Sequence, residues 1–161
     1  MIAYTNGYIN WDKLDDQGVE VEAFYKLNRL TITGFYAYVG GEVTTPVGAG
    51  AETKPNDLLR RPKHSVGINI GFKATEKLMA SVNLKTFGQR NDLFFDFNTF
   101  TTSPVVLGAY QLLDVYMEYV VINNRIKLFG DFRNLLDQAY YEVYGYGTQQ
   151  FNAMLGVRAQ F

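Results

Sequence analysis

Residues 65–74 read SVGINIGFKA, with an apolar side chain at every second position. A period of two places these side chains on one face of a β-strand and the small or polar residues between them on the other. Residues 78–84 and 114–121 repeat the alternation. No segment combines a 3.6-residue apolar period with capping residues, so we predict no helix. The pattern therefore predicts an all-β fold.

The strands form an up-and-down series in which short and long connections alternate. Eight strands are expected, at about 1–11, 17–27, 30–40, 63–75, 77–87, 110–122, 125–134 and 150–161. After a short first connection at 12–16, tight turns at 27–29, 75–77 and 122–125 alternate with long connections at 41–62, 88–109 and 135–149. In an antiparallel meander, alternate connections lie at opposite ends of the sheet. Short turns at one end and long loops at the other are typical of outer-membrane barrels.

Composition excludes several other classes of protein. The 161 residues include 12 Tyr, 12 Phe and 1 Trp but no Cys, so disulfide scaffolds, thiolate metal sites and Cys nucleophiles are excluded. A net charge of −1 gives no electrostatic footprint for nucleic acid. No run of about 18 apolar residues predicts a transmembrane helix.

Three barrel architectures fit the alternation. In a lipid-embedded barrel the apolar face meets hydrocarbon and the polar face lines a wet lumen, and the abundance of aromatic residues favours this orientation. Eight strands also suffice to close a small outer-membrane barrel of structural or adhesive function. A soluble lipocalin-like binding barrel would place the same polar face outside.

The C-terminal third carries motifs of a known family. Residues 129–141 read FGDFRNLLDQAYY and resemble the end of TonB-dependent outer-membrane receptors, where a strand closing in an N-L-F-D-like phrase and a Tyr pair precede the last extracellular loop. Residues 144–147 are similar to the Gly-Tyr turn of that family, and 151–161 to its last strand with a terminal Phe. Residues 60–65 resemble the opening of an earlier strand. The family's P-G-R phrase is replaced by residues 147–150.

The resemblance implies that residues 1–161 are the C-terminal portion of a barrel of about 22 strands, without the N-terminal plug domain. The family takes up scarce ligands such as siderophores, cobalamin or glycans, which implies transport in the outer membrane of a Gram-negative bacterium. The implied partners are outer-membrane lipid, the remainder of the barrel and plug, and the barrel assembly machinery. TonB itself would be reached only through the missing N-terminal part.

Two candidate functional features follow. The loop at 91–98 combines aromatic and acidic side chains, and with the last loop it supplies the candidate ligand-binding residues Asp92, Phe94, Phe95, Asp96, Phe97 and Tyr144. The same loop could instead pack over the barrel mouth. Phe161 ends an alternating strand, and the resemblance implies that it is the signal read by the assembly machinery, whereas an interfacial anchor is the alternative.

Other charged residues predict structure rather than chemistry. We expect no catalytic residue, no metal site and no cofactor, since the single histidine, His64, lies beside three cations. Charged residues on the polar face are expected to pair across strands. By parity, the periplasmic end holds Asn28, Glu76 and Asn124, and the outer end holds Thr45, Asp96 and Tyr144.

Overall fold

The computed structural model describes residues 13–45, 54–122 and 125–160, and every regular element in these ranges is a β-strand. The strands are β1 (Lys13–Leu27), β2 (Leu30–Thr45), β3 (Lys54–Asp57), β4 (His64–Lys73), β5 (Leu78–Phe87), β6 (Arg90–Asp96), β7 (Thr101–Leu107), β8 (Tyr110–Ile122), β9 (Ile126–Arg133) and β10 (Asn152–Ala159). The predicted all-β class is confirmed. The strand expected at 1–11, together with Asn124 and Phe161, lies outside the described residues.

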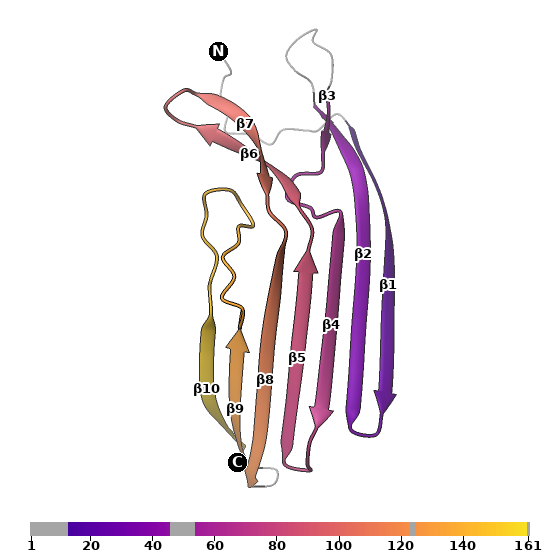
Figure 1. The fold of residues 1–161 in the computed structure, drawn as a ribbon, viewed down its shortest axis with the longest axis vertical. Coiled ribbons are helices and arrows are strands. Elements are labelled where there is room, and N and C mark those ends of the chain that lie inside the picture. Colours follow the sequence, from indigo (N-terminus) through magenta and orange to yellow (C-terminus); the bar gives the residue numbers. More distant parts are fainter. Residues whose placement is uncertain (1–12, 46–53, 123–124, 161) are drawn as a thin grey trace.

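The main sheet is an antiparallel meander in the order β1-β2-β4-β5-β8-β9-β10, with β3 added beside the end of β2. Figure 1 shows the tight connections β1–β2 and β4–β5 at one end of the sheet. The β6–β7 hairpin and the segment 134–151 lie toward the other end. The expected separation of short turns from long connections is therefore confirmed for the described strands. We call these two ends the turn end and the loop end.

Three sequence-based boundaries were wrong. Residues 13–16 belong to β1 and are not a turn. The expected loop at 88–109 is mostly the β6–β7 hairpin, and the expected loop at 41–62 contains the end of β2 and all of β3. The period-two pattern does not predict this hairpin, because Leu93, Phe94 and Phe95 are apolar in succession.

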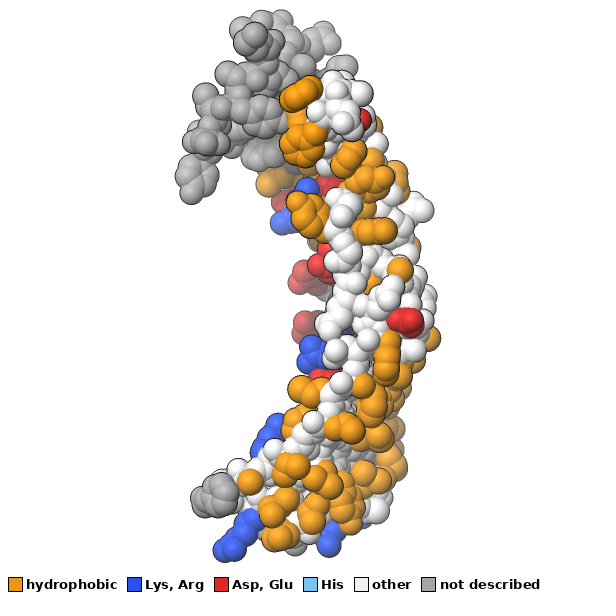
Figure 2. All heavy atoms as spheres, turned by 90° about the vertical axis from the view of Figure 1, so that its left-hand side faces the viewer, with side chains coloured by type: hydrophobic (Ala, Val, Ile, Leu, Met, Phe, Trp, Pro, Cys, Tyr) orange, Lys and Arg blue, Asp and Glu red, His pale blue; other side chains and the backbone are white. Residues whose placement is uncertain are grey.

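The main sheet has two chemically different faces. Ile68 of β4 lies opposite Gly34 and Leu84, whereas its neighbour Asn69 lies opposite Thr33 and Asn83. Figure 2 shows the sheet as a crescent, with hydrophobic side chains spread over the convex side and Asp, Glu, Lys and Arg on the concave side. An arc with an apolar outer wall and a polar inner wall is the geometry of a transmembrane barrel.

Few apolar side chains are buried. Among the described residues, only Leu58, Leu107 and Tyr110 are buried hydrophobics, while Val66, Ile68, Ile70 and Phe72 on the convex face of β4 are 39–48% exposed. A continuous exposed apolar surface of this kind indicates contact with lipid or with another protein. No helix in the described ranges has the length and hydropathy required to cross a membrane.

Aromatic rings on the concave face cover glycines of the neighbouring strand. The Phe35 ring occupies the space that a side chain at Gly67 would need, and the Phe129 ring does the same at Gly156. Each pair lies directly opposite in the register. A ring placed over a strand glycine shields its backbone and restores packing, as cross-strand aromatic–glycine pairs do in other sheets.

Candidate ligand-binding site

Asp92 of β6 joins three segments that are far apart in the sequence. Its carboxylate is fully buried, and Oδ1 accepts hydrogen bonds from the Arg60 Nε at 2.7 Å and the Leu93 amide at 2.8 Å. Oδ2 accepts the Tyr144 amide at 2.9 Å. The segment before β4, the β6–β7 hairpin and the last long connection are therefore held together by one side chain.

These contacts set the ionisation of Asp92. Burial alone would raise the pKa of this carboxyl group, but the amide hydrogen bonds from Tyr144 and Leu93 and the Arg60 guanidinium together lower the pKa below its usual value. A buried carboxylate is stable only when it is paired and hydrogen-bonded. Asp92 therefore stays charged in the folded state.

Arg90, at the start of β6, makes a second connection between the hairpin and the last connection. The side chain is buried, its Nη2 donates to the Tyr141 carbonyl at 2.7 Å, and its guanidinium carbon lies 4.7 Å from the centre of the Tyr110 ring. Tyr110 in turn stacks on Tyr140, with ring centres 4.2 Å apart. The Arg90 Nε has no protein hydrogen-bond partner among the described residues.

The predicted ligand-binding residues separate into two groups. Phe94 and Tyr144 lie edge to face, with ring centres 5.0 Å apart, beside the anchoring Asp92. Phe95 and Phe97 lie edge to face at the same separation near the hairpin tip, where Phe97 is 78% exposed. Asp96 at that tip accepts the Asn98 amide at 2.8 Å, and this bond lowers the pKa of the Asp96 carboxyl.

The structure thus brings Asp92, Phe94 and Tyr144 together and leaves Phe95, Asp96 and Phe97 at the far end of the hairpin. Direct ligand contact by any of the six residues stays a prediction. The sequence analysis did not predict that Arg60 binds Asp92, or that Arg90 and Tyr110 contact the last long connection. Arg60 is one of the three cations beside His64, and nothing in its sequence context shows that it reaches Asp92, 32 residues away.

The N-L-L-D part of the family motif shapes the last connection. Asn134 has a positive φ of 49°, and its buried side chain accepts the Gln138 amide at 3.1 Å and donates to the Gln138 carbonyl at 3.0 Å. Asp137 accepts the Phe151 amide at 2.9 Å and so joins the two ends of this connection. The motif therefore fixes the base of the segment that carries Tyr144.

The expected charge pairs on the concave face form in part. Glu118 of β8 binds Lys127 at 2.8 Å and Arg158 at 3.4 Å, and Arg133 binds Asp131 at 2.9 Å. Glu20, Glu22 and Lys85 share this face without a hydrogen bond or ion pair to any described residue. The Glu118 pairs join β8 to β9 and β10, whereas Arg133 and Asp131 both lie in β9. The Glu20, Glu22 and Lys85 charges remain available to a partner.

His64 lies on the convex face near the loop end, where its Nδ1 is 2.9 Å from the Tyr36 hydroxyl and its ring is 5.2 Å from that of Tyr38. A tyrosine–histidine group on an apolar outer wall suits the interfacial aromatic belt of a membrane barrel. No group of three or more His, Cys, Asp or Glu residues in the described part of the chain has a metal-binding arrangement.

Comparison with known proteins points to one family. No family model matches the chain. The Vibrio cholerae vitamin B12 transporter BtuB is 31% identical over 110 residues, which cover 68% of this chain and 17% of the transporter. The FpvAI receptor in its complex with pyocin S2 superposes with a TM-score of 0.74 at 15% identity, over 92% of this chain and 19% of that one.

The chain resembles part of a TonB-dependent outer-membrane receptor barrel. The siderophore receptor PiuA of Acinetobacter baumannii gives a TM-score of 0.68 at 18% identity, over 89% of this chain and 21% of that receptor. The resemblance inferred from the sequence motifs is therefore confirmed, and the relatives are outer-membrane receptors, as the motifs imply. The chain spans less than a fifth of the length of the curated relatives that it matches.

Proposed function

We propose that residues 1–161 are the C-terminal portion of the barrel of a TonB-dependent receptor, without the plug domain. The whole receptor would take up a scarce ligand across the outer membrane of a Gram-negative bacterium. The observation that carries this proposal is the crescent-shaped antiparallel sheet, apolar on its convex face and charged on its concave face. Its long connections lie toward one end and are joined there through Asp92.

In such a receptor, the two faces of the sheet would contact different surroundings. The convex face would contact lipid, and the concave face would contact the plug that fills the lumen. The loop end would face the medium and meet the ligand first, since long loops of outer-membrane barrels are extracellular. TonB would bind outside this segment, and the barrel assembly machinery would insert it. Transport by such a receptor requires no enzymatic chemistry of these strands.

The ligand class follows from the relatives' names. BtuB is a vitamin B12 transporter, and FpvA is a receptor for ferripyoverdine. A siderophore complex or cobalamin is therefore the proposed cargo. Phe94 and Tyr144, held by Asp92, would stack on planar parts of such a ligand, with Phe95, Asp96 and Phe97 at the hairpin tip making the first contact.

The two other barrel architectures fit the structure less well. If the two described edge strands of the main sheet closed on each other, β1, with 15 residues, would pair with β10, which has eight. That pairing leaves nearly half of the β1 edge without a partner, which is costly in lipid. A soluble barrel would turn its apolar face inward, whereas here the apolar face is convex.

Uptake by the native strain tests the proposal. Deleting the gene that encodes this chain should abolish uptake of one radiolabelled cargo, either ferric siderophore or cobalamin, while the other cargo enters normally. Membrane fractionation of the parent strain should find the chain in the outer membrane. Recovery of the chain from the soluble fraction, or unchanged uptake of a panel covering both cargo classes, would contradict the proposal.

A further inference from the structure

A small pocket lies at the loop end, between the end of β2, the segment that precedes β4 and the base of the β6–β7 hairpin. It encloses about 210 Å³. Three of its described lining residues are cations, Arg61, Lys63 and Arg90, and none of them is acidic. Gln89 and Asn91, which carry amide side chains, also line it. The charge of this lining favours an anion.

Arg90 is the buried cation of the pocket. It is 5% exposed, its Nη2 donates to the Tyr141 carbonyl, and its Nε has no hydrogen-bond partner among the described residues. No carboxylate in the described ranges forms an ion pair with Arg90, since Glu142 binds the Tyr110 hydroxyl at 3.4 Å instead. A buried charge is stable only when it is compensated. Arg90 is thus a buried cation for which these residues supply no counterion.

The other two cations of the pocket, Arg61 and Lys63, are exposed. Arg61 donates to the Asp16 carboxylate at 3.0 Å, and the two side chains are 57% and 44% exposed. Exposed ion pairs of this kind are weak, so Arg61 can exchange Asp16 for a ligand. A guanidinium binds a carboxylate or a phosphate through two parallel hydrogen bonds. The pocket therefore combines a buried guanidinium with an exposed one, and both suit an oxyanion.

The position of Arg90 indicates the side from which an anion would approach. Its guanidinium carbon lies 4.7 Å from the centre of the Tyr110 ring, and Tyr110 is in phase with Glu118 on the concave face of β8. The approach is therefore from the concave side and not from the apolar convex face. Pockets that enclose a whole small molecule hold about 300–1,000 Å³, so this one accepts a single group of a larger molecule.

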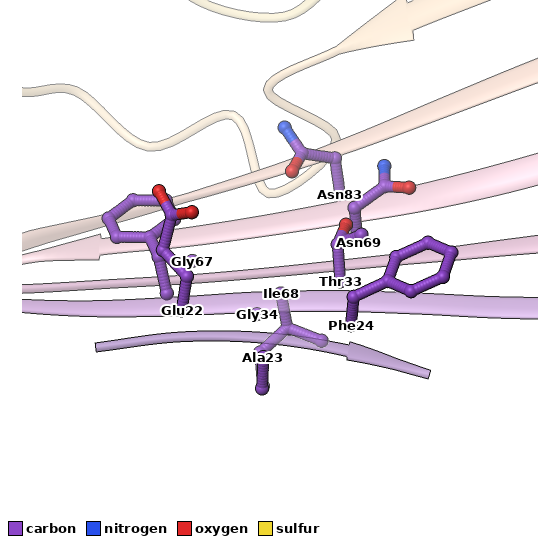
Figure 3. Close-up of a pocket in the computed structure, with 10 residues that line it drawn as sticks. Glu22, Ala23, Phe24, Thr33, Gly34, Gly67, Ile68, Asn69 and Asn83 are labelled. Carbon is purple, nitrogen blue, oxygen red and sulfur yellow. The ribbon is translucent and has the colours of Figure 1, made fainter. Parts of the chain in front are cut away.

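A second hollow on the concave face has the opposite charge. It encloses about 660 Å³ between β1, β2 and β4, and Glu22 is the one charged residue among its described lining residues. Figure 3 shows Glu22, Asn69 and Asn83 projecting from the same side of the strands into this hollow. An anion on the concave side is therefore attracted to the pocket at Arg90 and repelled from the hollow at Glu22.

We propose that the pocket at Arg90 binds the oxyanion group, a carboxylate or a phosphate, of a small molecule on the concave side of the sheet. Arg90 would be its buried counterion, and Arg61 would close over it from the exposed side. Assigning this molecule to the cargo rests on the receptor function proposed above. The inference then narrows the cargo to a molecule that carries an exposed anionic group.

A first test compares probes that differ in charge. Succinate, inorganic phosphate and the neutral succinamide are titrated onto the whole receptor in detergent, and the Arg90 Nε–H signal of arginine-labelled protein is followed by NMR. We expect saturable shifts with both anions, at dissociation constants at least fivefold below that of succinamide.

Two substitutions of equal charge control the titration. Arg61→Gln should raise the dissociation constant of succinate at least twofold, whereas Lys26→Gln, on the concave face near the turn end, should leave it unchanged. Arg90→Gln should remove the preference for succinate over succinamide. Equal binding of succinate and succinamide, or equal effects of Arg61→Gln and Lys26→Gln, would overturn the proposal.

A second test identifies the source of the anion. The receptor is placed in nanodiscs that contain a phosphorylated glycolipid or its dephosphorylated form, and the Arg90 signal should be the same in both. A shift that requires the lipid phosphate would overturn binding of a small molecule.

Uptake of radiolabelled cargo by the native strain tests the assignment to the cargo. Arg61→Gln should raise the half-saturating concentration at least twofold, and Lys26→Gln should not. Unchanged uptake in Arg61→Gln would overturn this assignment. If deletion of the gene leaves all uptake intact, the proposed function fails, and the probe titration still decides whether the pocket binds an anion.

Discussion

At the scale of single residues, Asp92 determines whether the segments at the loop end are held together or are free to move separately. One buried carboxylate accepts three hydrogen bonds, of which two come from other segments. Removing a buried acceptor leaves its donors without partners, and hydrogen bonds to charged groups contribute about 1.5–3 kcal/mol each. The position of Tyr144 therefore depends on Asp92 more than on its own ring contact with Phe94.

Asp92→Ala should release the last connection from the hairpin. We expect the Tyr144 amide to exchange its hydrogen at least tenfold faster, since a loss of about 1.5–3 kcal/mol is available from this contact. Hydrogen exchange followed by NMR in detergent micelles measures it. Asp96→Ala at the exposed hairpin tip is the matched control and should leave exchange at Tyr144 unchanged. Equal effects of the two substitutions would contradict the anchoring role.

The same contact predicts a dependence on pH. Because the folded state lowers the pKa of Asp92, this carboxylate stabilises the fold fully above its unfolded pKa of about 3.9. The contribution is lost as the pH falls through the lower, folded value. Tyr144 amide protection should therefore persist down to about pH 4 and fall below it, while Asp92→Asn should show no such step. A step centred above pH 5 would contradict the lowered pKa.

At the scale of strands, alternation predicted most of the main sheet because each strand has one apolar and one polar face. The bounds expected for β4, β5, β8 and β9 agree with the structure to within two residues. Alternation was not informative for β6 and β7, where apolar residues follow one another and the strands pair in a separate sheet. The partners of Asp92 were also beyond prediction, because they depend on contacts between segments 32 and 52 residues apart.

Two adjacent positions of β4 distinguish the faces. Ile68→Arg places a charge on the convex face and should lower the free energy of unfolding by about 2–4 kcal/mol if that face lies near the middle of the bilayer. Asn69→Arg places the charge on the concave face and should cost much less. Urea unfolding in lipid vesicles, followed by tryptophan fluorescence and gel mobility, measures both. Equal losses would indicate a strand buried on both faces.

At the scale of the molecule, the orientation of the sheet in the membrane is the most direct test of the proposed receptor barrel. The turns at Asn28 and Glu76 lie at the turn end, and the hairpin with Asp96 at the opposite end. Single cysteines are introduced at these positions and at Tyr144 in the whole receptor, and intact cells are treated with an impermeant thiol reagent. We expect labelling at positions 96 and 144 and none at 28 and 76. The opposite pattern would invert the topology.

The last strand carries a prediction about assembly. Leu155 and Val157 of β10 are 77% and 65% exposed on the convex face, in phase with the apolar series that the sequence continues to Phe161, which lies outside the described residues. If Phe161 is the signal for insertion, its deletion from the whole receptor should slow insertion and leave chains in the periplasm. Pulse-chase fractionation measures this. Normal insertion with lower stability of the inserted barrel would instead identify an anchor.

The two edge strands of the described main sheet differ in length, so the rim of the sheet is higher on one side than on the other. β1 has 15 residues and β10 has eight, and seven residues at about 3.3 Å each amount to about 23 Å. A bulky ligand that arrives from the medium therefore meets a wall that is taller at β1 and β2 than at β9 and β10. Residues 134–151 lie above this lower side, so we expect a ligand that has touched the hairpin tip to enter here, past the segment that carries Tyr144.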